Sequence, residues 1–342
     1  MNSKITLVGF GVAGQLLLSH ILQIVPKHQV CIVDPDFIGG DLARDYRAVT
    51  TNTMIGQKVE SLKESWPSIA TALAKRGELT DCVLLCDLIH DIRQSSHDYA
   101  RGCKQIYDTV KDISWSAETK TWTLNFQSRP SHTTSIVCIC TGMEPRQEDY
   151  GIPIIPLRIA LDPVALKHTV SDGQHVIVFG SSHSATLILK SLHELSISTT
   201  CIHHTKTPFK YDRDGNYGGI KQESAVIADA ILRGEYKALT LVALSDVKGL
   251  SNAIRRADWC IQAVGFSPRI PNIIGIDSQP VWDPATGLTD QMTHIQCYGA
   301  CVPNKTLVGT IAYPDISVGA FVDQIGVRWP LLKKLIEDIS II

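Results

Sequence analysis

The sequence predicts an α/β protein with two domains of one kind, each built on a parallel β-sheet. The first observation is ITLVGFGVAGQLLL at residues 5–18, where β-formers, a G-x-G-x-x-G turn and helix formers follow one another. The second is HVIVFGSSHSATLILKSL at residues 175–192, which repeats this order. The third is the length, because 342 residues are enough for two domains. Strand–turn–helix units of this kind are typical of Rossmann-like domains.

Composition places the chain among ordinary globular proteins, with 44% hydrophobic and 19% charged residues. The formal net charge is −2 and no long basic run stands out, so we expect no nucleic-acid partner. No apolar stretch reaches the roughly 20 residues that span a bilayer, so we expect no membrane partner. Lys4 and the apolar run after it resemble a secretory signal, but glycines at fixed offsets and the lack of an A-x-A site argue against one.

The ten cysteines form no C-x-x-C pair. Most lie inside apolar runs such as SIVCICTG, where a buried free thiol in a reducing compartment is the simplest interpretation. The spacing excludes the redox dithiol of a disulfide reductase and a zinc ribbon. We therefore predict no metal site and a cytoplasmic location.

The first glycine turn has the context of a dinucleotide site. Gly9 allows a tight turn, Gly11 allows close approach of a pyrophosphate, and Gly14 allows close packing of helix on strand. Asp34 ends the next hydrophobic strand about twenty residues later, where a carboxylate binds a ribose hydroxyl. The alternative is a generic βαβ turn with a surface aspartate.

The segment after Asp34 helps to distinguish the nucleotide. Gly39 and Gly40 follow the acid, and a long polar loop then leads to TTNT at residues 50–53. A simple dehydrogenase would return directly to a helix and a third strand. The long loop indicates a cofactor that continues beyond its pyrophosphate, with Gly40 among the contacts; a plain surface loop is the alternative.

The second glycine turn is degraded. Gly180 keeps the first position, whereas Ser182 replaces the second glycine and Ala185 the third, where alanine is tolerated. The following strand ends in two histidines and Lys206, and a cationic end can accept a 2′-phosphate, which favours NADPH over NADH. Solvated residues on an edge loop are the alternative. His183 lies inside the turn, where it could meet a phosphate, cap the helix or pack.

Two further segments, SIVCICTGMEP at 135–145 and WCIQAVGFSPR at 259–269, are buried strands that end in a small residue and glycine. A proline follows each glycine by a few residues, which is typical of a domain exit. Each segment closes a region that a glycine turn began. We therefore count Thr141, Gly142 and Gly265 among the cofactor contacts.

Together these motifs resemble the flavoproteins with two dinucleotide-binding domains, especially the class B flavin-dependent monooxygenases. The resemblance rests on GFGVAG, Asp34, GG at 39–40, TTNT, CTGMEP, GSSHSA and QAVGFSP. It implies FAD at the first turn and NADPH or NADH at the second. It also matches Asn52 to the asparagine beside the isoalloxazine, which implies a catalytic role. The alternative is that Asn52 is an ordinary residue of a polar turn.

The chain departs from the monooxygenase pattern in two places. The fingerprint F-x-G-x-x-x-H-x-x-x-Y/F is missing from DYGIPIIPLRIALDPVALKHTV. The late G-D motif of the disulfide-reductase branch is also missing, because Ala300 follows Gly299. In this architecture Gly299 precedes a helix that points at the flavin. A flavoprotein is therefore better supported than a hydroxylase.

The resulting expectation is a discontinuous FAD-binding domain of residues 1–170 and 271–342, with an NAD(P)H-binding domain of residues 171–270 inserted. We predict an FAD-dependent, NADPH-using oxidoreductase that acts on a small molecule, with a monooxygenase as the more specific form of this hypothesis. A flavin reductase or oxidase without hydroxylation, and a non-catalytic FAD-holding protein, are the alternatives. The sequence does not indicate the oligomeric state.

Overall fold

The computed structural model describes residues 3–211, 219–275, 294–301, 306–308, 311–313 and 318–339. The chain divides into two compact units. Unit 1 consists of Met1–Arg44, Met54–Met143 and Pro268–Ile342, and unit 2 consists of Asp45–Thr53 and Glu144–Ser267. The short loop Asp45–Thr53 thus belongs to unit 2, although unit 1 lies on both sides of it in the sequence.

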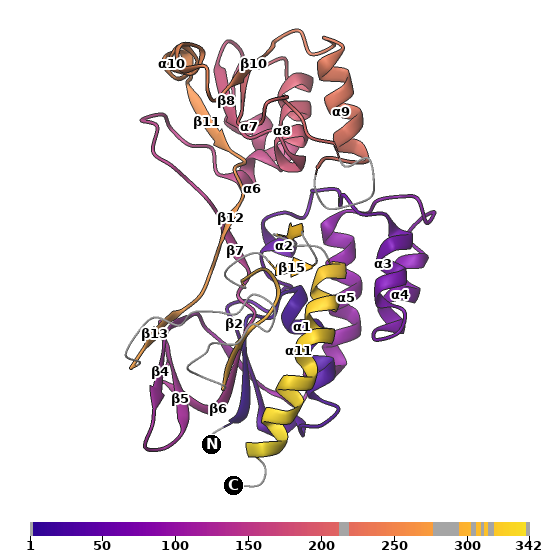
Figure 1. Ribbon diagram of the computed structural model, residues 1–342, viewed down its shortest axis with the longest axis vertical. Helices are drawn as coiled ribbons and strands as arrows, with labels where there is room; N and C mark the ends of the chain where they lie inside the picture. The colour runs from indigo at the N-terminus through magenta and orange to yellow at the C-terminus, as the bar shows by residue number, and fades with distance from the viewer. Residues whose placement is uncertain are drawn as a thin grey trace. The chain divides into compact units, whose positions relative to one another are not determined.

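Unit 1 contains an eight-stranded sheet (Figure 1). Its parallel strands run in the order β6-β1-β2-β3, and β14 also pairs with β6. All five residues of β2 are buried, as expected of a parallel strand covered on both faces. The bounds are β1 (Ser3–Val8), β2 (Val30–Asp34), β3 (Lys104–Tyr107), β6 (His132–Ile139) and β14 (Ile295–Cys297).

An antiparallel hairpin extends this sheet beyond β6. The strands β4 (Val110–Ser116) and β5 (Thr121–Phe126) pair with each other, β5 pairs with β6, and β13 (Asn272–Ile274) joins β4. Alternate residues of β5 are buried, which is the period of a strand with one face on the core. Trp122 and Leu124 of the hairpin thus belong to the same buried cluster as Val137 of β6.

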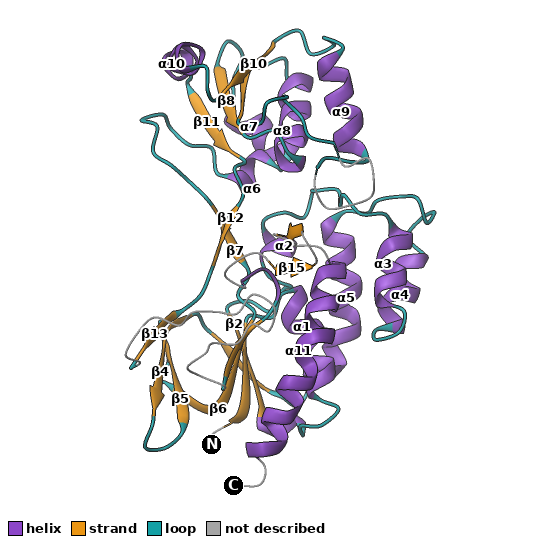
Figure 2. Cartoon of the chain, viewed as in Figure 1, coloured by secondary structure: helices purple, strands orange, loops and turns teal. Residues whose placement is uncertain are grey.

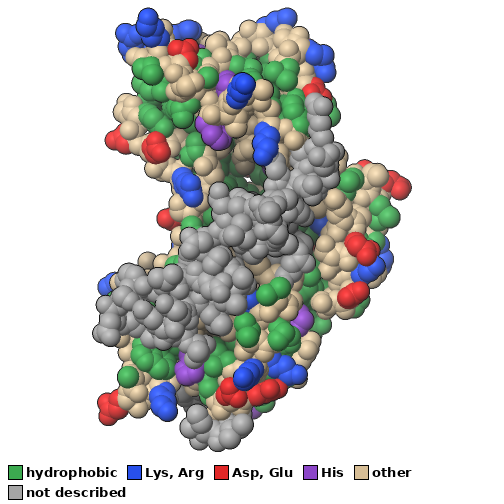
Figure 3. Space-filling view, viewed as in Figure 1, with side chains coloured by type: hydrophobic (Ala, Val, Ile, Leu, Met, Phe, Trp, Pro, Cys, Tyr) green, Lys and Arg blue, Asp and Glu red, His purple; other side chains and the backbone are tan. Residues whose placement is uncertain are grey.

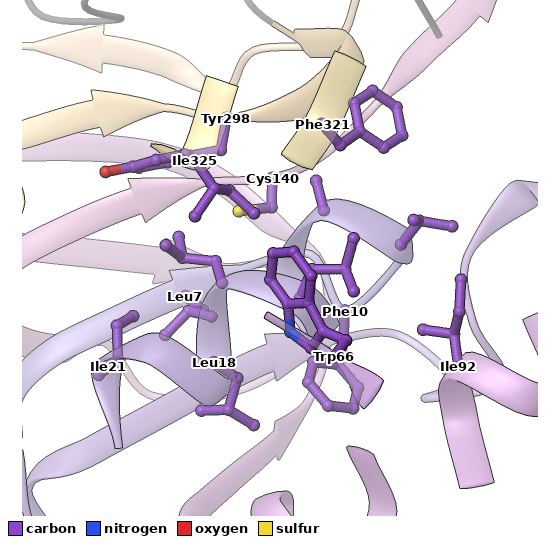
Figure 4. Packing of buried hydrophobic residues seen from close by; sticks show 14 of the residues in the cluster. Leu7, Phe10, Leu18, Ile21, Trp66, Ile92, Cys140, Tyr298, Phe321 and Ile325 are labelled. Carbon is purple, nitrogen blue, oxygen red and sulfur yellow. The ribbon is translucent and has the colours of Figure 1, made fainter. Parts of the chain in front are cut away.

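The helices of unit 1 cover the parallel strands. α1, α5 and α11 lie side by side (Figure 2). Figure 4 shows Leu7 of β1, Cys140 after β6 and Ile325 of α11 in one buried cluster. The helices are α1 (Val12–Ile21), the 3-10 helix η1 (Lys27–Gln29), α2 (Asp41–Arg44), α3 (Ile55–Leu62), α4 (Pro67–Ala74), α5 (Leu85–Ala100), η2 (Gly299–Cys301) and α11 (Val318–Ile339).

Unit 2 contains a four-stranded parallel sheet in the order β10-β9-β8-β11. Its strands are β8 (His175–Phe179), β9 (Ser198–His203), β10 (Leu239–Ala243) and β11 (Trp259–Gln262). Its helices are α6 (Leu157–Ala160), α7 (Pro163–Thr169), α8 (His183–Glu194), α9 (Glu223–Leu232) and α10 (Val247–Arg256). The short strands β7 (Met143–Pro145) and β12 (Phe266–Pro268) pair with each other, as do β15 (Thr306–Val308) and β16 (Ile311–Tyr313).

The two units share one arrangement of parallel strands. In each, the strand before the glycine turn lies between the strand after the next helix and the strand that closes the unit: β2-β1-β6 in unit 1 and β9-β8-β11 in unit 2. This order places both turns at the carboxyl ends of the strands, where open α/β sheets bind ligands. The predicted α/β class with two Rossmann-like units is confirmed.

Lys and Arg side chains gather over α10, at one end of unit 2 (Figure 3). Arg255 and Arg256 are exposed in the last turn of this helix, directly before β11. Because β11 is parallel to β8, these two arginines lie at the amino edge of the sheet, opposite the second turn. Lys206 follows the carboxyl end of β9 and is therefore on the same edge as the turn.

Candidate functional site

Backbone contacts between β1, β2 and the end of β6 fix the first turn. The N–H of Gly9 donates to the Val33 carbonyl at 2.8 Å, and the N–H of Cys140 donates to the Val8 carbonyl at 2.7 Å. Gly9 has φ +97°, and a Cβ at this position would lie 2.5 Å from the Cys140 carbonyl oxygen. Both the backbone angle and the lack of space therefore require glycine here.

The two following glycines of the motif serve different purposes. A Cβ on Gly14 would lie 2.3 Å from the Gly9 carbonyl oxygen, so this glycine is needed for packing of α1. Among the described residues, a Cβ on Gly11 would meet nothing nearer than the Gly39 carbonyl oxygen at 3.8 Å. The fold alone does not demand glycine at position 11, and the open space there suits a ligand.

The N-terminus of α1 is suited to an anion. Gly11 is its N-cap, and in the described part of the chain no side-chain hydrogen bond caps the helix there. The first N–H groups of a helix lack intrahelical partners, and the helix dipole favours negative charge beside them. Gly40, at φ +74°, packs against this turn, since its own Cβ would lie 3.1 Å from the Gly11 Cα. The structure thus brings the predicted residues Gly9, Gly11, Gly14 and Gly40 together.

Asp34, a residue that is 4% exposed, holds the turn through its carboxylate. Oδ2 accepts the Phe10 N–H at 2.7 Å, and Oδ1 accepts the N–H groups of Phe37 at 2.7 Å and Asp36 at 3.1 Å. Burial raises the pKa of Asp34, while these three N–H donors act in the opposite direction. A carboxylate has about four acceptor sites, so capacity for a ribose hydroxyl remains.

An aromatic cluster beside Asp34 was not anticipated from the sequence. The ring centroid of Phe37 lies 4.5 Å from that of Tyr107 and 5.6 Å from that of Phe10. Tyr107 ends β3 and is 50% exposed, so one of these rings is open at the carboxyl edge. Such a face can stack on a planar base. The sequence does not indicate this cluster, because the position of the Phe37 ring depends on φ +55° at that residue. Such an angle is unusual for a residue with a side chain.

The segment that leaves β6 is tied to the returning chain. The Thr141 hydroxyl donates to the Arg269 carbonyl, and the Arg269 N–H donates to the Gly142 carbonyl at 3.0 Å. The Arg269 guanidinium lies 2.9 Å from Asp41. Gly142 has φ +73°, and apart from its neighbours in the chain no described residue comes within 4 Å of the position that its Cβ would take. Arg269 and Asp41, which lie far apart in the sequence, therefore border this candidate site.

Gly299 places the end of β14 against α1. It has φ +72°, and a Cβ there would lie 2.5 Å from the Ala13 Cβ. Its N–H donates to Gln324 Oε1 of α11 at 2.9 Å. Gly299 thus packs closely against α1, the helix that follows the first glycine turn.

The second turn repeats the backbone contacts of the first. The N–H of Gly180 donates to the Ile202 carbonyl at 2.9 Å, and the N–H of Ala263 donates to the Phe179 carbonyl at 2.8 Å. Gly180 has φ +110°, and a Cβ there would lie 2.3 Å from the Ala263 carbonyl oxygen. Ser182 is the exposed N-cap of α8 at φ −101°, an angle that serine adopts without strain.

Two polar side chains at the carboxyl end of β9, His203 and Lys206, differ in their accessibility. His203 is buried, and its Nδ1 lies 2.9 Å from the Thr205 carbonyl oxygen, so this ring turns back into the protein. Lys206 is exposed. Lys206 is therefore the better placed of the two to meet a ligand at the carboxyl edge of unit 2.

Both ring nitrogens of His183 lie beside protein groups. Nδ1 is 2.5 Å from Ser224 Oγ, and Nε2 is 3.1 Å from the Thr50 carbonyl oxygen. Burial lowers the pKa of His183, and the hydrogen bond to Thr50 acts in the opposite direction. The structure thus connects His183 to the loop Asp45–Thr53.

Asn52 lies in that loop and is half-buried. Its Oδ1 accepts the Thr53 hydroxyl at 3.3 Å, and the Thr51 hydroxyl donates to the Thr53 carbonyl at 3.1 Å. Gly265, at φ +95°, has open space around it, and its carbonyl accepts the Arg146 N–H at 3.0 Å. Asn52 and Gly265 both belong to unit 2.

Within the described part of the chain, no three His, Cys, Asp or Glu side chains are grouped as metal ligands. The ten cysteines are free thiols. Burial raises the pKa of Cys31 and of Cys201 to about 12, so these thiols stay protonated near neutral pH. No helix of the described residues combines the length and apolar character needed to cross a bilayer.

Comparison with known proteins supports this architecture. No protein-family model matches the chain. A curated protein named monooxygenase AgnR1, from Paecilomyces divaricatus, is 26% identical over 220 residues, which cover 56% of this chain and 55% of that protein. The chain therefore spans about half the length of the curated relative that it matches.

Solved structures match over nearly the whole chain. A flavin-containing monooxygenase from Stenotrophomonas maltophilia has a TM-score of 0.67 at 17% identity, covering 99% of both chains. The ornithine N-hydroxylase of Kutzneria sp. 744 has a TM-score of 0.67 at 14% identity, covering 99% of this chain and 100% of that one. This chain has the fold of the flavoproteins with two dinucleotide-binding domains.

This flavoprotein fold is not confined to monooxygenases. Thioredoxin reductase from Lactococcus lactis has a TM-score of 0.60 at 12% identity, covering 98% of this chain and 100% of that one. The resemblance inferred from the motifs is confirmed at the level of the fold. The fold alone does not define the reaction, which depends on the residues of the site.

Proposed function

We propose that this two-domain flavoprotein is an FAD-dependent oxidoreductase that uses NADPH. The observation that carries the proposal is the presence of two glycine turns, at Gly9 and Gly180, with matching backbone hydrogen bonds. Each turn lies at the carboxyl ends of the parallel strands of its sheet. One dinucleotide site would suffice for a simple dehydrogenase. Two sites in one chain suit a protein that holds a bound flavin and a nicotinamide nucleotide.

FAD is assigned to unit 1. The space at Gly11 and the uncapped N-terminus of α1 would receive the pyrophosphate, and the remaining acceptor capacity of Asp34 would receive a ribose hydroxyl. Gly40, Gly142 and Gly299 border this site, whereas the Thr141 hydroxyl is engaged by the returning chain. Bound FAD would supply the redox chemistry, accepting a hydride and passing electrons to oxygen or an organic acceptor.

NADPH is assigned to unit 2. The N-terminus of α8, with Ser182 exposed at its N-cap, would receive the pyrophosphate, and Gly265 has free space beside it. Lys206 would pair with the 2′-phosphate that distinguishes NADPH from NADH. The functional domains would then follow the two compact units rather than boundaries at residues 170 and 270.

The finer proposal is monooxygenation of a small organic substrate, with Asn52 as the catalytic residue. The match to a curated monooxygenase and the resemblance of TTNT support it. The missing fingerprint and the Ala300 that follows Gly299 favour a second candidate, a flavin reductase or oxidase. The free thiols support a reducing, cytoplasmic location.

An absorption spectrum and anaerobic stopped-flow reduction test the proposal. We expect purified protein to bind FAD and NADPH to bleach the flavin faster than NADH does. Lys206→Ala should weaken NADPH binding about tenfold and leave NADH binding unchanged. Hydroxylated product in proportion to oxygen consumed indicates a monooxygenase, whereas peroxide indicates an oxidase. Protein that stays colourless with excess FAD contradicts the proposal.

A further inference from the structure

The contacts of His183 define its tautomer. The Thr50 carbonyl can only accept a hydrogen bond, so Nε2 must carry a proton. Burial lowers the pKa of His183 and favours the neutral ring, which leaves a lone pair on Nδ1. The Ser224 hydroxyl, which is fully buried, then donates to Nδ1. Ser224 thereby fixes the tautomer that donates to Thr50.

The bond to Thr50 is an anchor for the loop Asp45–Thr53. Tyr46, the second residue of the loop, has its ring edge-on to Phe266 at a centroid distance of 6.2 Å. The Val49 N–H donates to the Tyr46 carbonyl at 3.0 Å, which makes the middle of the loop a turn. His183 holds the loop at Thr50, two residues before Asn52. These contacts explain why the loop is part of unit 2.

His183 is also the first residue of α8, directly after the N-cap Ser182. An anion at this helix terminus would contact the backbone N–H groups of the first turn, including that of His183. The backbone of His183 is therefore at the assigned nucleotide site, while its side chain holds the loop that carries Asn52. His183 therefore links the assigned nucleotide site directly to the loop Asp45–Thr53.

We propose that His183 is a positioning residue which couples nicotinamide-nucleotide binding at the second turn to the placement of Asn52, through its hydrogen bond to the Thr50 carbonyl. This coupling rests on the proposed function for its ligand. The proposal explains why the His183 ring contacts protein groups, Ser224 and Thr50, through both of its nitrogens. It predicts that nucleotide binding at α8 orders the loop Asp45–Thr53.

Two variants separate the contacts of the ring. In His183→Gln the carboxamide reaches the position of Nε2 and can still donate to Thr50. In His183→Asn the shorter side chain reaches only the position of Nδ1, so the contact to Ser224 is kept and that to Thr50 is lost. Ser224→Ala is a third variant, which leaves the ring in place without the donor that fixes its tautomer.

Hydrogen exchange by mass spectrometry on the full FAD-loaded chain reads the loop directly. The Val49 amide, which is hydrogen-bonded inside the loop, is the reporter in the peptide of residues 45–53. We expect His183→Asn to raise the exchange rate there about five- to tenfold and His183→Gln to stay within about twofold of the parent. Ser224→Ala should lie between them. Exchange in α1 is the internal control and should not change.

NADP⁺ is the probe for coupling. We expect it to slow exchange of residues 45–53 in the parent and in His183→Gln, and to leave the loop of His183→Asn unprotected. The dissociation constant of NADP⁺ should stay within about threefold in both variants, because the backbone of α8 is unchanged. Protection of the loop by NADP⁺ in the parent, lost in His183→Asn although NADP⁺ still binds, is the sign of coupling. A residue that only holds the loop gives the same loop exchange in the parent with and without NADP⁺, and that result overturns the coupling.

The coupling is overturned if His183→Asn shows parental loop exchange, or if NADP⁺ protects its loop as fully as that of the parent. Failure of the proposed function has a different signature, in which the parent itself binds neither FAD nor NADP⁺. In that case the ligand-free comparison of His183→Asn with His183→Gln still decides whether His183 holds the loop.

Discussion

The two glycine turns of this chain share a backbone design and differ in side-chain chemistry. Gly9 and Gly180 occupy equivalent positions, each at a left-handed φ and each against a carbonyl of the strand that closes its unit. The second position is Gly11 in unit 1 and Ser182 in unit 2. The strand end is a buried, hydrogen-bonded Asp34 in unit 1 and the inward-facing His203, with no acid, in unit 2.

This difference separates what a Rossmann-like unit needs to fold from what it needs to bind. The first glycine is kept in both turns because a Cβ would overlap a main-chain carbonyl. The second position varies because its backbone angle suits any residue, and only the ligand decides how much space is required. We therefore expect substitutions at the first position to affect stability and substitutions at the second to affect cofactor binding.

The largest effect is expected for alanine at the first glycine of either turn. Gly9→Ala and Gly180→Ala each combine a left-handed φ with a Cβ at 2.5 Å or less from a carbonyl oxygen, and should cost about 3 kcal/mol of unfolding free energy. Urea unfolding of the full chain measures this. Gly142→Ala and Gly265→Ala are matched controls, since both are left-handed with open space around them, and should cost about 1 kcal/mol. Equal losses in turn and control variants would disprove the steric argument.

The next effect concerns FAD rather than stability. Gly11→Ala should weaken FAD binding tenfold or more, because its Cβ would occupy the space assigned to the pyrophosphate, while the unfolding free energy changes by less than about 1 kcal/mol. Flavin fluorescence titration and thermal unfolding measure the two quantities. Gly14→Ala should show the opposite balance, because its Cβ would lie 2.3 Å from the Gly9 carbonyl oxygen. If Gly11→Ala binds FAD normally, the pyrophosphate is not at this turn.

Acid should affect the two units unequally. At the amino ends of the two sheets, His132 Nε2 lies 2.8 Å from Ser3 Oγ in unit 1, and His175 Nδ1 lies 2.8 Å from Ser198 Oγ in unit 2. Burial, assisted by the charge of Lys104, lowers the pKa of His132 to about 4. The neutral ring is favoured in the folded protein, so this stabilisation is present above the unfolded pKa of about 6.5 and is lost as the pH falls toward 4.

His175 should contribute a shallower slope. Burial and Arg256 lower its pKa, but Asp258 acts in the opposite direction. We expect His132→Gln to flatten the fall of stability between about pH 6.5 and pH 4 more than His175→Gln does. Urea midpoints measured across this pH range test the prediction. A larger flattening in His175→Gln than in His132→Gln would contradict it.

The smallest effect is expected at the second position of the second turn. Ser182→Gly should tighten NADP⁺ binding by about two- to fourfold, because it removes the Cβ beside the assigned pyrophosphate, and should change stability by only a few tenths of a kcal/mol. Isothermal titration measures the affinity. Weaker binding in Ser182→Gly would indicate that the serine hydroxyl itself donates to the nucleotide.

Sequence reasoning located the two turns because their requirements are local. Glycine spacing depends on the turn itself and on the helix that follows, and Asp34 is reached by one βαβ unit. The same reasoning did not find Arg269 or Tyr107, because each joins the site through strand pairing across a long stretch of chain. For His183 the sequence suggested three roles: contact with a phosphate, capping of the helix, or packing. It did not indicate the partner Thr50, which is 133 residues away in the sequence.

By itself the sequence determined the α/β class, the two glycine turns and the type of cofactor that they suit. These features depend on short-range sterics and hydrophobic periodicity, which involve only residues close together in the sequence. Only the tertiary structure decided that the loop Asp45–Thr53 packs with unit 2, that Phe37 meets Tyr107, and that His183 reaches Thr50. These contacts arise when β-strands from distant segments align at one sheet edge. Their energy comes from packing and hydrogen bonds that no local pattern encodes.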